Sequence, residues 1–407
     1  MLYLTYDGLL DPLGGSQIIP YVKGLSSSSR KFHILSFEKR KRIIDSSAAM
    51  RDELQMLGIG WTFLVFTERF GILGKLWDLM RLYLAAARIA MHRGIGVVHA
   101  RGHAAAKVGA LIKHVTGAKL IFDFRGLWAD ERVDKGGWDL SKFFHRAQYH
   151  HFKRSERRLL VFVDQIVVLT EAVVEEIRRI SATSISKINV IPCCADFDHF
   201  RPQDVNARSL SLNRLGIPPE ARVLGYLGSI GRLYQIDRFL RLFEIAANID
   251  DRVHSLVITT DVEAFAKLVE RFVPHELRSR IKVHSATRAE VPIAICGMDV
   301  SVCFIETSYA RIAASPTKLA ECFAMGIPAI CNAGVGDVEE QVRMLGGGIV
   351  VDPKSDEDLL KVAGKISQIA EMGGTRLREA ARPVLGLEFA ISRYQRVYDN
   401  LLTSRLC

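Results

Sequence analysis

Short apolar runs alternate with longer amphipathic segments along the whole chain, and this alternation restricts the possible folds more than any other feature. An unbroken apolar run is typical of a strand buried in a parallel sheet, and an amphipathic segment is typical of the helix that links two such strands. The sequence therefore predicts an α/β fold. The expected strands lie at 1–6, 32–37, 60–65, 97–100, 119–124, 165–169 and 188–191, and then at 223–228, 255–260, 282–284, 300–304, 327–331 and 348–351.

The chain has 407 residues, too many for one ordinary core, so we expect two domains. The segment at 190–202 resembles the strand and turn that close the first domain of the GT-B fold, and this resemblance implies a boundary near 203–211. We expect a first domain at 1–205 and a second at 206–385. The amphipathic segment within 386–407 resembles the terminal helix that crosses back to the first domain in that fold. With 49% hydrophobic and 25% charged residues the composition is globular, which argues against extensive disorder.

The segment from Ser315 to Pro328 combines a loop, a helix and a glycine stop. Ser315 or Thr317 can cap the helix, and Pro316 suits a first turn that needs no amide hydrogen. Lys318 opposes the positive end of the helix dipole, and a bound anion would offset that cost. The segment therefore predicts a site for an anion, most simply a diphosphate.

This segment resembles the sugar-nucleotide binding helix of the family 4 glycosyltransferases. Their GT-B fold has two facing Rossmann-like domains with parallel sheets and an interdomain cleft. Glu321 matches the family's second glutamate, which holds the ribose, and Ala313 stands where the first would contact the donor sugar. The resemblance covers most of the chain. It implies a retaining enzyme that moves a sugar from a UDP- or GDP-sugar to a glycan or lipid-diphosphate acceptor in cell-surface polysaccharide synthesis.

A cluster of ionisable residues follows the expected strand at 119–124, where open α/β sheets place their ligands. It forms either surface ion pairs or an active site, and the neighbouring Trp128 favours the second. The cluster resembles an Asp-x-Arg-Gly-x-Trp-x-Asp-Glu run of one subgroup of the family. Better-known members have histidine in place of Arg125, and arginine cannot act as a base. We expect Asp123, Arg125, Asp130 and Glu131 to be catalytic. Asp130 or Glu131 accepts the acceptor's proton, unless the leaving phosphate does.

Two other strand ends are expected at the same rim of the first domain. Gly14 and Gly15 follow the first strand, where a glycine-rich loop lets a ligand approach the backbone, although such a pair is often only a turn. Arg101 and His103 follow the strand at 97–100. We expect Arg101 and His103, together with Trp128, to lie on the acceptor side of the active site.

The second domain is expected to hold the donor. In the family, the first strand end of this domain carries an arginine and a lysine on the diphosphate, whereas this chain has Ser229 and Tyr234. A departing nucleoside diphosphate still needs positive charge, which Lys318 and then Arg232 are expected to supply. The loop after 282–284 is expected to hold the base. The expected donor-binding residues are Gly14, Gly15, Ser229, Arg232, Tyr234, His284, Ala286, Ser315, Pro316, Thr317, Lys318 and Glu321.

The net charge of +10 is unevenly distributed, because residues 1–200 carry 29 basic and 20 acidic side chains and the rest carry 26 and 25. A basic half favours an anionic membrane, a lipid diphosphate or nucleic acid. Two basic stretches, 71–93 and 142–158, contain apolar stripes that either face the core or dock on anionic lipid. The cations expected at an anionic membrane surface are Lys153, Arg154, Arg157 and Arg158.

Other classes of protein stay open. A degenerate, binding-only GT-B protein fits the uncharged residues at 229, 234 and 313. A non-specific nucleic-acid-binding protein would use the basic half, although no nucleic-acid module appears, and a sugar-nucleotide epimerase would need paired carboxylates. No metal-ligand motif occurs, so we expect neither a metal nor a cofactor. Without a signal-like or transmembrane segment or paired cysteine spacing, we expect a cytoplasmic protein, peripheral on the inner face of the plasma membrane.

Overall fold

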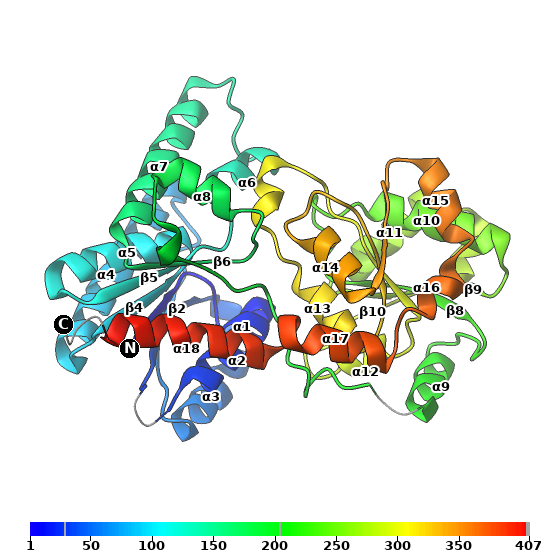
Figure 1. Ribbon diagram of the computed structural model, residues 1–407, viewed down its shortest axis with the longest axis horizontal. Coiled ribbons are helices and arrows are strands. Elements are labelled where there is room, and N and C mark those ends of the chain that lie inside the picture. The colour runs from blue at the N-terminus through cyan, green and yellow to red at the C-terminus, as the bar shows by residue number, and fades with distance from the viewer. Residues whose placement is uncertain (28–29, 203–204, 404–407) are drawn as a thin grey trace. The chain divides into compact units, whose positions relative to one another are not determined.

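The computed structural model of the protein describes residues 1–27, 30–202 and 205–403, and the chain divides into two compact units. Unit 1 comprises Met1–Pro192 and the chain from Ala390 onward, and unit 2 comprises Cys193–Phe389 (Figure 1). The domain boundaries expected at 205 and 385 stay predictions. Residues 203 and 204, at the start of the expected linker, lie outside the described residues.

Unit 1 contains a parallel sheet, as the apolar runs predict. Among the described residues it has seven strands in the order β3-β2-β1-β4-β5-β6-β7. Leu2 is in register with Val98, and Ile166 with Ile188. The strands are β1 (Leu2–Thr5), β2 (His33–Glu38), β3 (Gly60–Val65), β4 (Val97–Arg101), β5 (Lys119–Asp123), β6 (Gln165–Val168) and β7 (Ile188–Val190).

Helices cover both faces of this sheet (Figure 1). Because crossovers between parallel strands are right-handed, the reversal of strand order at β1 sends the helices after β1 and β2 to one face and the later ones to the other. Within the described part of the unit, the helices are α1 (Pro12–Gln17), α2 (Ile19–Leu25), α3 (Arg40–Met56), α4 (Gly71–Arg93), α5 (Gly102–Thr116), α6 (Trp128–Asp134), α7 (Phe143–Phe162), α8 (Val174–Ser181), the 3-10 turn η1 (Ile185–Lys187) and α18 (Leu387–Thr403).

The C-terminal helix α18 is anchored in unit 1 by aromatic residues. Tyr398 packs edge-on against Phe32, and its hydroxyl lies 2.7 Å from Nδ1 of His99 on β4. Tyr394 packs edge-on against Tyr21 of α2. All of these side chains are buried, so α18 completes the core of unit 1.

Unit 2 repeats the architecture with a second parallel sheet of six described strands, in the order β10-β9-β8-β11-β12-β13. Phe239, Phe243 and Phe265 pack on one side of it, and Phe323 packs in a separate cluster. The strands are β8 (Arg222–Leu227), β9 (Val253–Ile258), β10 (Ile281–His284), β11 (Val300–Cys303), β12 (Ala329–Cys331) and β13 (Gly348–Val350). The helices described in this unit are α9 (Val205–Arg214), α10 (Ile236–Ile249), α11 (Val262–Phe272), η2 (His275–Arg280), α12 (Val291–Ile295), η3 (Tyr309–Ala313), α13 (Thr317–Ala324), α14 (Val338–Leu345), α15 (Asp356–Ala363), α16 (Ile366–Ala370) and α17 (Thr375–Leu385).

The predicted glycine-rich loop is wrong in one respect, because Gly14 and Gly15 lie inside α1. Pro12 at the first turn starts this helix before the glycines. Gly14 is buried so closely that a Cβ there would lie 2.4 Å from the carbonyl oxygens of Gly8 and Leu9, whereas a Cβ on Gly15 would meet nothing within 4 Å. Only the first glycine is therefore required by packing.

These two glycines give a matched test of the packing. Gly14→Ala should lower the free energy of unfolding by about 1–3 kcal/mol, because the added methyl group must displace backbone atoms. Gly15→Ala should leave it unchanged or raise it by up to about 1 kcal/mol, as expected for alanine in a helix. Urea denaturation of both variants measures the difference, and equal effects would contradict the close approach at Gly14.

Candidate active site

Helix α13 of unit 2 begins without a side-chain cap. The N-cap residue is Pro316, so the expectation that Ser315 or Thr317 caps the helix is wrong. The Ser315 hydroxyl instead accepts a hydrogen bond from the backbone amide of Cys193 at 3.1 Å, and Thr317 is the first helical residue. The start of a helix carries a partial positive charge. In α13 the Leu319 amide bonds to the carbonyl oxygen of Pro316 at 3.0 Å, and an anion at this end of the helix stays a prediction.

Lys318, in the first turn of α13, holds its ammonium group between two aromatic rings. Nζ lies 3.9 Å from the ring centre of Tyr234 and 4.7 Å from that of Tyr226. It is buried and has no hydrogen-bond partner among the described residues. Burial alone would lower the pKa of Lys318, but Cys303 and the two tyrosines outweigh it and raise the pKa. The site therefore contains a buried ammonium group that is held between two aromatic rings and has a raised pKa.

The end of β8 faces this ammonium group. Gly228 has a φ of 128°, a conformation that favours glycine, and a Cβ there would lie 3.6 Å from Nζ of Lys318. The Tyr226 hydroxyl donates to the carbonyl oxygen of Ser229 at 2.6 Å, which fixes the loop after the strand. Ser229 and Arg232 are exposed in this loop. Of the two cations expected on the diphosphate, Lys318 is thus buried against the loop and Arg232 lies at its surface.

Glu321 lies one turn after Lys318 and is also buried, but it has a partner that the sequence did not predict. Arg288 forms an ion pair with its carboxylate and stacks over the ring of Phe200, 4.8 Å from the ring centre. Burial raises the pKa of Glu321, and Arg288 offsets part of that effect. A pentose that hydrogen-bonds to Glu321 must share the carboxylate with Arg288 or displace it.

The remaining residues of unit 2 near the predicted donor site differ in how deeply they are buried. His284 is exposed at the end of β10, and Ala286 packs against the core beside that strand. Ala313 is buried at the end of η3, directly before the α13 loop. Arg311 of the same turn is buried as well, and the sequence analysis did not select it.

In unit 1, the structure gathers Arg101, Asp123 and Arg125 at the carboxyl ends of β4 and β5. The Asp123 carboxylate lies 3.4 Å from a guanidinium nitrogen of each arginine. Both arginines also donate to Oε1 of Gln17, at 2.8 and 2.6 Å, and Arg101 contacts Asp7 at 3.3 Å. Gln17 and Asp7 come from the first βα unit, and nothing in the sequence near 123 points to them.

Asp123 is unsuited to act as a base in this setting. Burial alone would raise its pKa, but the guanidinium groups of Arg125 and Arg101 outweigh burial and hold the pKa well below its usual value. A carboxylate with a depressed pKa does not retain a proton near neutral pH. Its clearest role is to orient the two arginines, of which Arg125 is the more exposed.

Asp130 belongs to a second network, separate in its contacts from Asp123. Its carboxylate accepts from the Tyr149 hydroxyl at 2.7 Å and from Lys153 at 2.9 Å. Lys153 also contacts Glu156 at 2.8 Å, and Glu156 lies 2.8 Å from Nε2 of His103. Asp130 and Lys153 neutralise each other. Asp130, one of the two expected bases, and Lys153, one of the four expected membrane cations, are therefore both engaged within the protein.

Glu131 and Trp128 complete the predicted set in unit 1. Glu131 is partly exposed and pairs with Lys135 at 2.8 Å, so it is the more accessible of the two expected bases. Trp128 lies in an aromatic cluster, 4.8 Å from Phe152 and 5.5 Å from Trp138 between ring centres. These contacts give Trp128 a packing role between α6 and α7.

Two family models match the chain in succession. The model of Glycosyltransferase Family 4 matches residues 51–199, and that of the glycosyl transferases group 1 matches residues 208–382. The chain is a family 4 glycosyltransferase. Together the two models span most of its length, and the membership agrees with the resemblance carried by the α13 segment.

Solved structures share the GT-B fold of this glycosyltransferase. A Rickettsia africae glycosyltransferase has a TM-score of 0.74 at 15% identity, with 98% of each chain covered. Anabaena HepE in complex with UDP-glucose has a TM-score of 0.72 at 14% identity, over 98% of this chain and 99% of that chain. Sucrose-phosphate synthase from Thermosynechococcus elongatus has a TM-score of 0.72 at 15% identity, with 99% of each chain covered. No curated protein sequence matches significantly.

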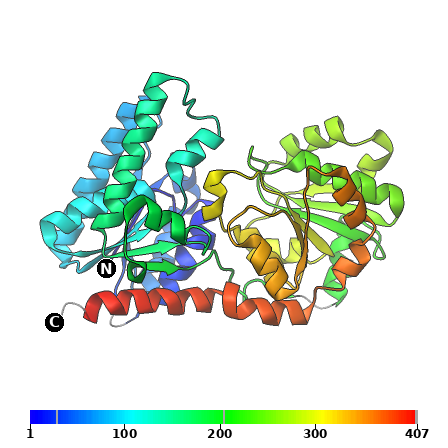
Figure 2. The same ribbon diagram turned by 45° about the horizontal axis from the view of Figure 1, so that its top comes forward.

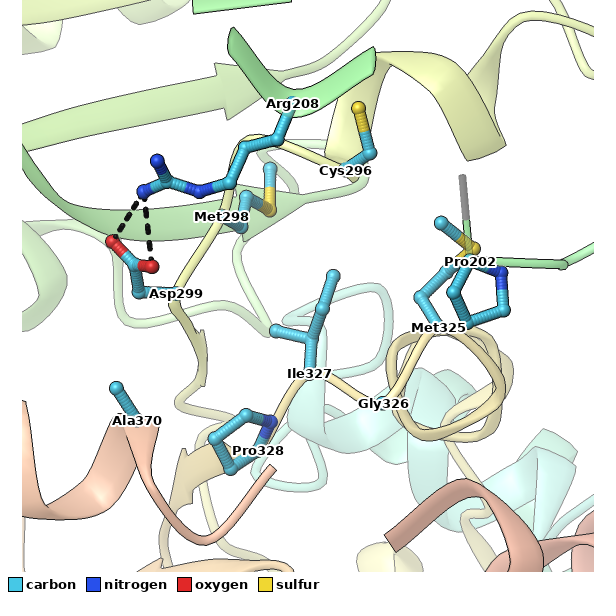
Figure 3. A pocket seen from close by; sticks show the side chains of 10 residues that line it. All are labelled: Pro202, Arg208, Cys296, Met298, Asp299, Met325, Gly326, Ile327, Pro328 and Ala370. Atoms are coloured by element: carbon cyan, nitrogen blue, oxygen red, sulfur yellow. Dashed lines mark hydrogen bonds and ion pairs between the residues drawn. The ribbon is translucent and has the colours of Figure 1, made fainter. Parts of the chain in front are cut away.

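A pocket of unit 2 lies away from these residues. It has a cavity volume of about 320 Å³ and is lined by Gly326 and Pro328, among others (Figure 3). These two residues follow the C-terminal end of α13, whereas Lys318 lies in its first turn. The lining of this pocket is mostly apolar, and its charged groups, Arg208 and Asp299, pair with each other at 3.0 Å. It offers no free cation for a diphosphate.

Among the described residues, no three His, Cys, Asp or Glu side chains gather in a geometry for a metal ion. Over the same ranges, no helix combines the length and apolarity needed to span a membrane.

Proposed function

We propose that this glycosyltransferase is a retaining enzyme that transfers a sugar from a UDP-sugar to a glycan or lipid-diphosphate acceptor in cell-surface polysaccharide synthesis. One observation carries the proposal: the Lys318 ammonium group is buried at the uncapped start of α13, with no hydrogen-bond partner in the part of the chain that the structure describes. A buried cation without a counter-charge is costly. A diphosphate would place negative charge beside this ammonium group, at the positive N-terminal end of the helix dipole.

The donor would extend from this diphosphate site along α13. The pentose hydroxyls would donate to Glu321, one turn further on, in competition with Arg288. The base would lie against the loop at 284–288, as the sequence predicts. HepE is similar in fold and is solved with UDP and with UDP-glucose, which supports uridine rather than guanosine in the proposal.

Transfer with retention would suit the carboxylates of unit 1. Asp123 and Asp130 are both engaged by cations, so neither is a ready base. We propose that the bond from the anomeric carbon to the phosphate oxygen breaks while the bond to the acceptor oxygen forms on the same face. The acceptor's hydroxyl proton would pass to the leaving phosphate oxygen. Lys318 and the helix amides would neutralise the leaving group, so the reaction needs no metal. We propose that the enzyme works in the cytoplasm.

A thermal-shift panel tests the donor site. UDP and UDP-sugars should raise the melting temperature, because a ligand at one hundred times its dissociation constant stabilises the native state by about 2.7 kcal/mol. GDP- and ADP-sugars should have little effect. A shift with GDP-sugars alone would overturn the choice of base, and no shift with any nucleotide would overturn the donor site. The anomeric configuration of the product, measured by NMR, tests retention.

A further inference from the structure

Helix α4 of unit 1 presents an apolar stripe to solvent. The side chains of Leu73, Leu76 and Trp77 are 71%, 57% and 53% exposed. The face of α4 that packs on the protein consists instead of Gly74, Asp78, Leu82, Ala86 and Ala90. The core-facing interpretation of the stretch 71–93 is therefore wrong. The outward stripe consists of Ile72, Leu73, Leu76, Trp77, Met80 and Leu84.

Helix α7 adds a second exposed apolar group. Phe143 and Phe144, at its start, are 78% and 63% exposed. Both α4 and α7 pack against α5, and Figures 1 and 2 show them on the same side of the sheet of unit 1. Helix α4 lies between β3 and β4, and α7 lies between α6 and β6, so both lead back from the edge where the strands have their carboxyl ends. The two apolar surfaces therefore belong to one side of the unit.

The exposed charged residues on α4 and α7 all have the same sign. The acidic residues within α4 and α7 are Asp78 and Glu156, and both are buried. The exposed charged residues are all basic: Lys75, Arg88 and Arg93 on α4, and Arg146, Arg154, Arg157 and Arg158 on α7. Arg154 and Arg158 follow Phe143 at helical spacing, so they share its face.

We propose that α4 and the start of α7 form a docking surface for an anionic lipid bilayer, with the α4 stripe inserted at the level of the headgroups. Exposed apolar residues combined with basic residues are what such an interface requires. A second copy of this chain would bring like charges together, which disfavours self-association. The proposal deepens the proposed function, because an enzyme with a lipid-linked acceptor works at a bilayer surface. Of the four cations that the sequence analysis expects at the membrane, Arg154, Arg157 and Arg158 are exposed, whereas Lys153 pairs with Asp130 and Glu156.

Vesicle sedimentation tests the surface in the full chain. The protein should bind phosphatidylcholine vesicles that contain phosphatidylglycerol, and should bind less at high salt or without the anionic lipid. The double change Leu76→Glu and Trp77→Glu should weaken binding at least about tenfold, since it puts charge where apolar side chains insert. The control Ile44→Glu and Met56→Glu changes two exposed apolar residues of α3, on the opposite face of the sheet, and should bind like the parent.

Fluorescence tests insertion itself. Brominated lipids should quench part of the tryptophan emission of the parent, and Trp77→Leu, which keeps an apolar side chain, should lose that quenching while still binding vesicles. Unchanged quenching in Trp77→Leu, or equal binding by the α3 and α4 variants, would overturn the proposal. A lipid-free dimer without vesicle binding would assign the surface to a second copy instead.

The thermal shift with UDP-sugars, measured without lipid, separates the two proposals. A variant of α4 that keeps this shift is folded, and its loss of vesicle binding then reports on the docking surface alone. If the parent binds vesicles but shows no nucleotide shift, the proposed function fails and the docking surface stands. The reverse result rejects the docking surface and keeps the donor site.

Discussion

Lys318→Met should lower kcat/KM by at least about 10²-fold and remove the thermal shift with UDP, without lowering the stability of the free protein. The reason is the environment of Nζ, which lies between the rings of Tyr226 and Tyr234 with no hydrogen-bond partner in the described chain. Methionine fits between aromatic rings and removes a buried charge, so the melting temperature of the unliganded protein should rise. Steady-state kinetics and thermal denaturation with and without UDP measure both effects.

The combination of outcomes separates binding from structure. If Lys318 served only the fold, its replacement would lower the melting temperature and leave the shift with UDP in place. Lys361→Met is the control, because Lys361 is an exposed lysine of the same unit that pairs with Glu357 on the surface of α15. It should change neither activity nor the nucleotide shift.

Asp123→Asn should lower the free energy of unfolding by about 3–5 kcal/mol, since it leaves two guanidinium groups without their shared counter-charge. The pKa of Asp123 is depressed in the folded state, so its contribution is fully present above the unfolded value and is lost as the pH falls below about 4. The variant should therefore show a smaller loss of stability on acidification than the parent. Urea denaturation of the parent and of the variant at neutral and acid pH measures both the loss of unfolding free energy and its pH dependence.

Asp7→Asn provides the matched comparison. Asp7 contacts the same Arg101 at 3.3 Å but is half-exposed, and an exposed ion pair contributes only about 0–1 kcal/mol. Equal losses in the two variants would contradict the central position of Asp123. An Asp123→Asn protein that unfolds like the parent would do the same.

Local sequence was enough to predict the strands and the helix at 317–324. Parallel strands are buried on both faces, so their apolar runs stand out without knowledge of their neighbours. The place of Lys318 in the first turn of that helix was also readable. The anion site inferred from it stays a prediction. Arg288 and Gln17 were missed because their partners, Glu321 and the pair of arginines, lie far along the chain.

The sequence also left open which face of the helix at 71–93 packs on the core. The periodicity of 71–93 shows an apolar stripe, and stripes normally face the core. The core side of α4 consists mainly of small residues together with Leu82, so the stronger signal belongs to the solvent side. Gly14 and Gly15 were assigned to a loop for a similar reason, since the packing of Gly14 against Gly8 and Leu9 is set by the fold.

The anchoring of α18 determines the order in which the protein can mature during synthesis. The hydroxyl of Tyr398 meets His99 across 299 positions of the chain, and both are buried. A ribosome releases the first 192 residues long before it releases this helix. The nascent first unit therefore lacks the tyrosine that packs on Phe32 and His99, and it reaches its final form only after α18 has been synthesised.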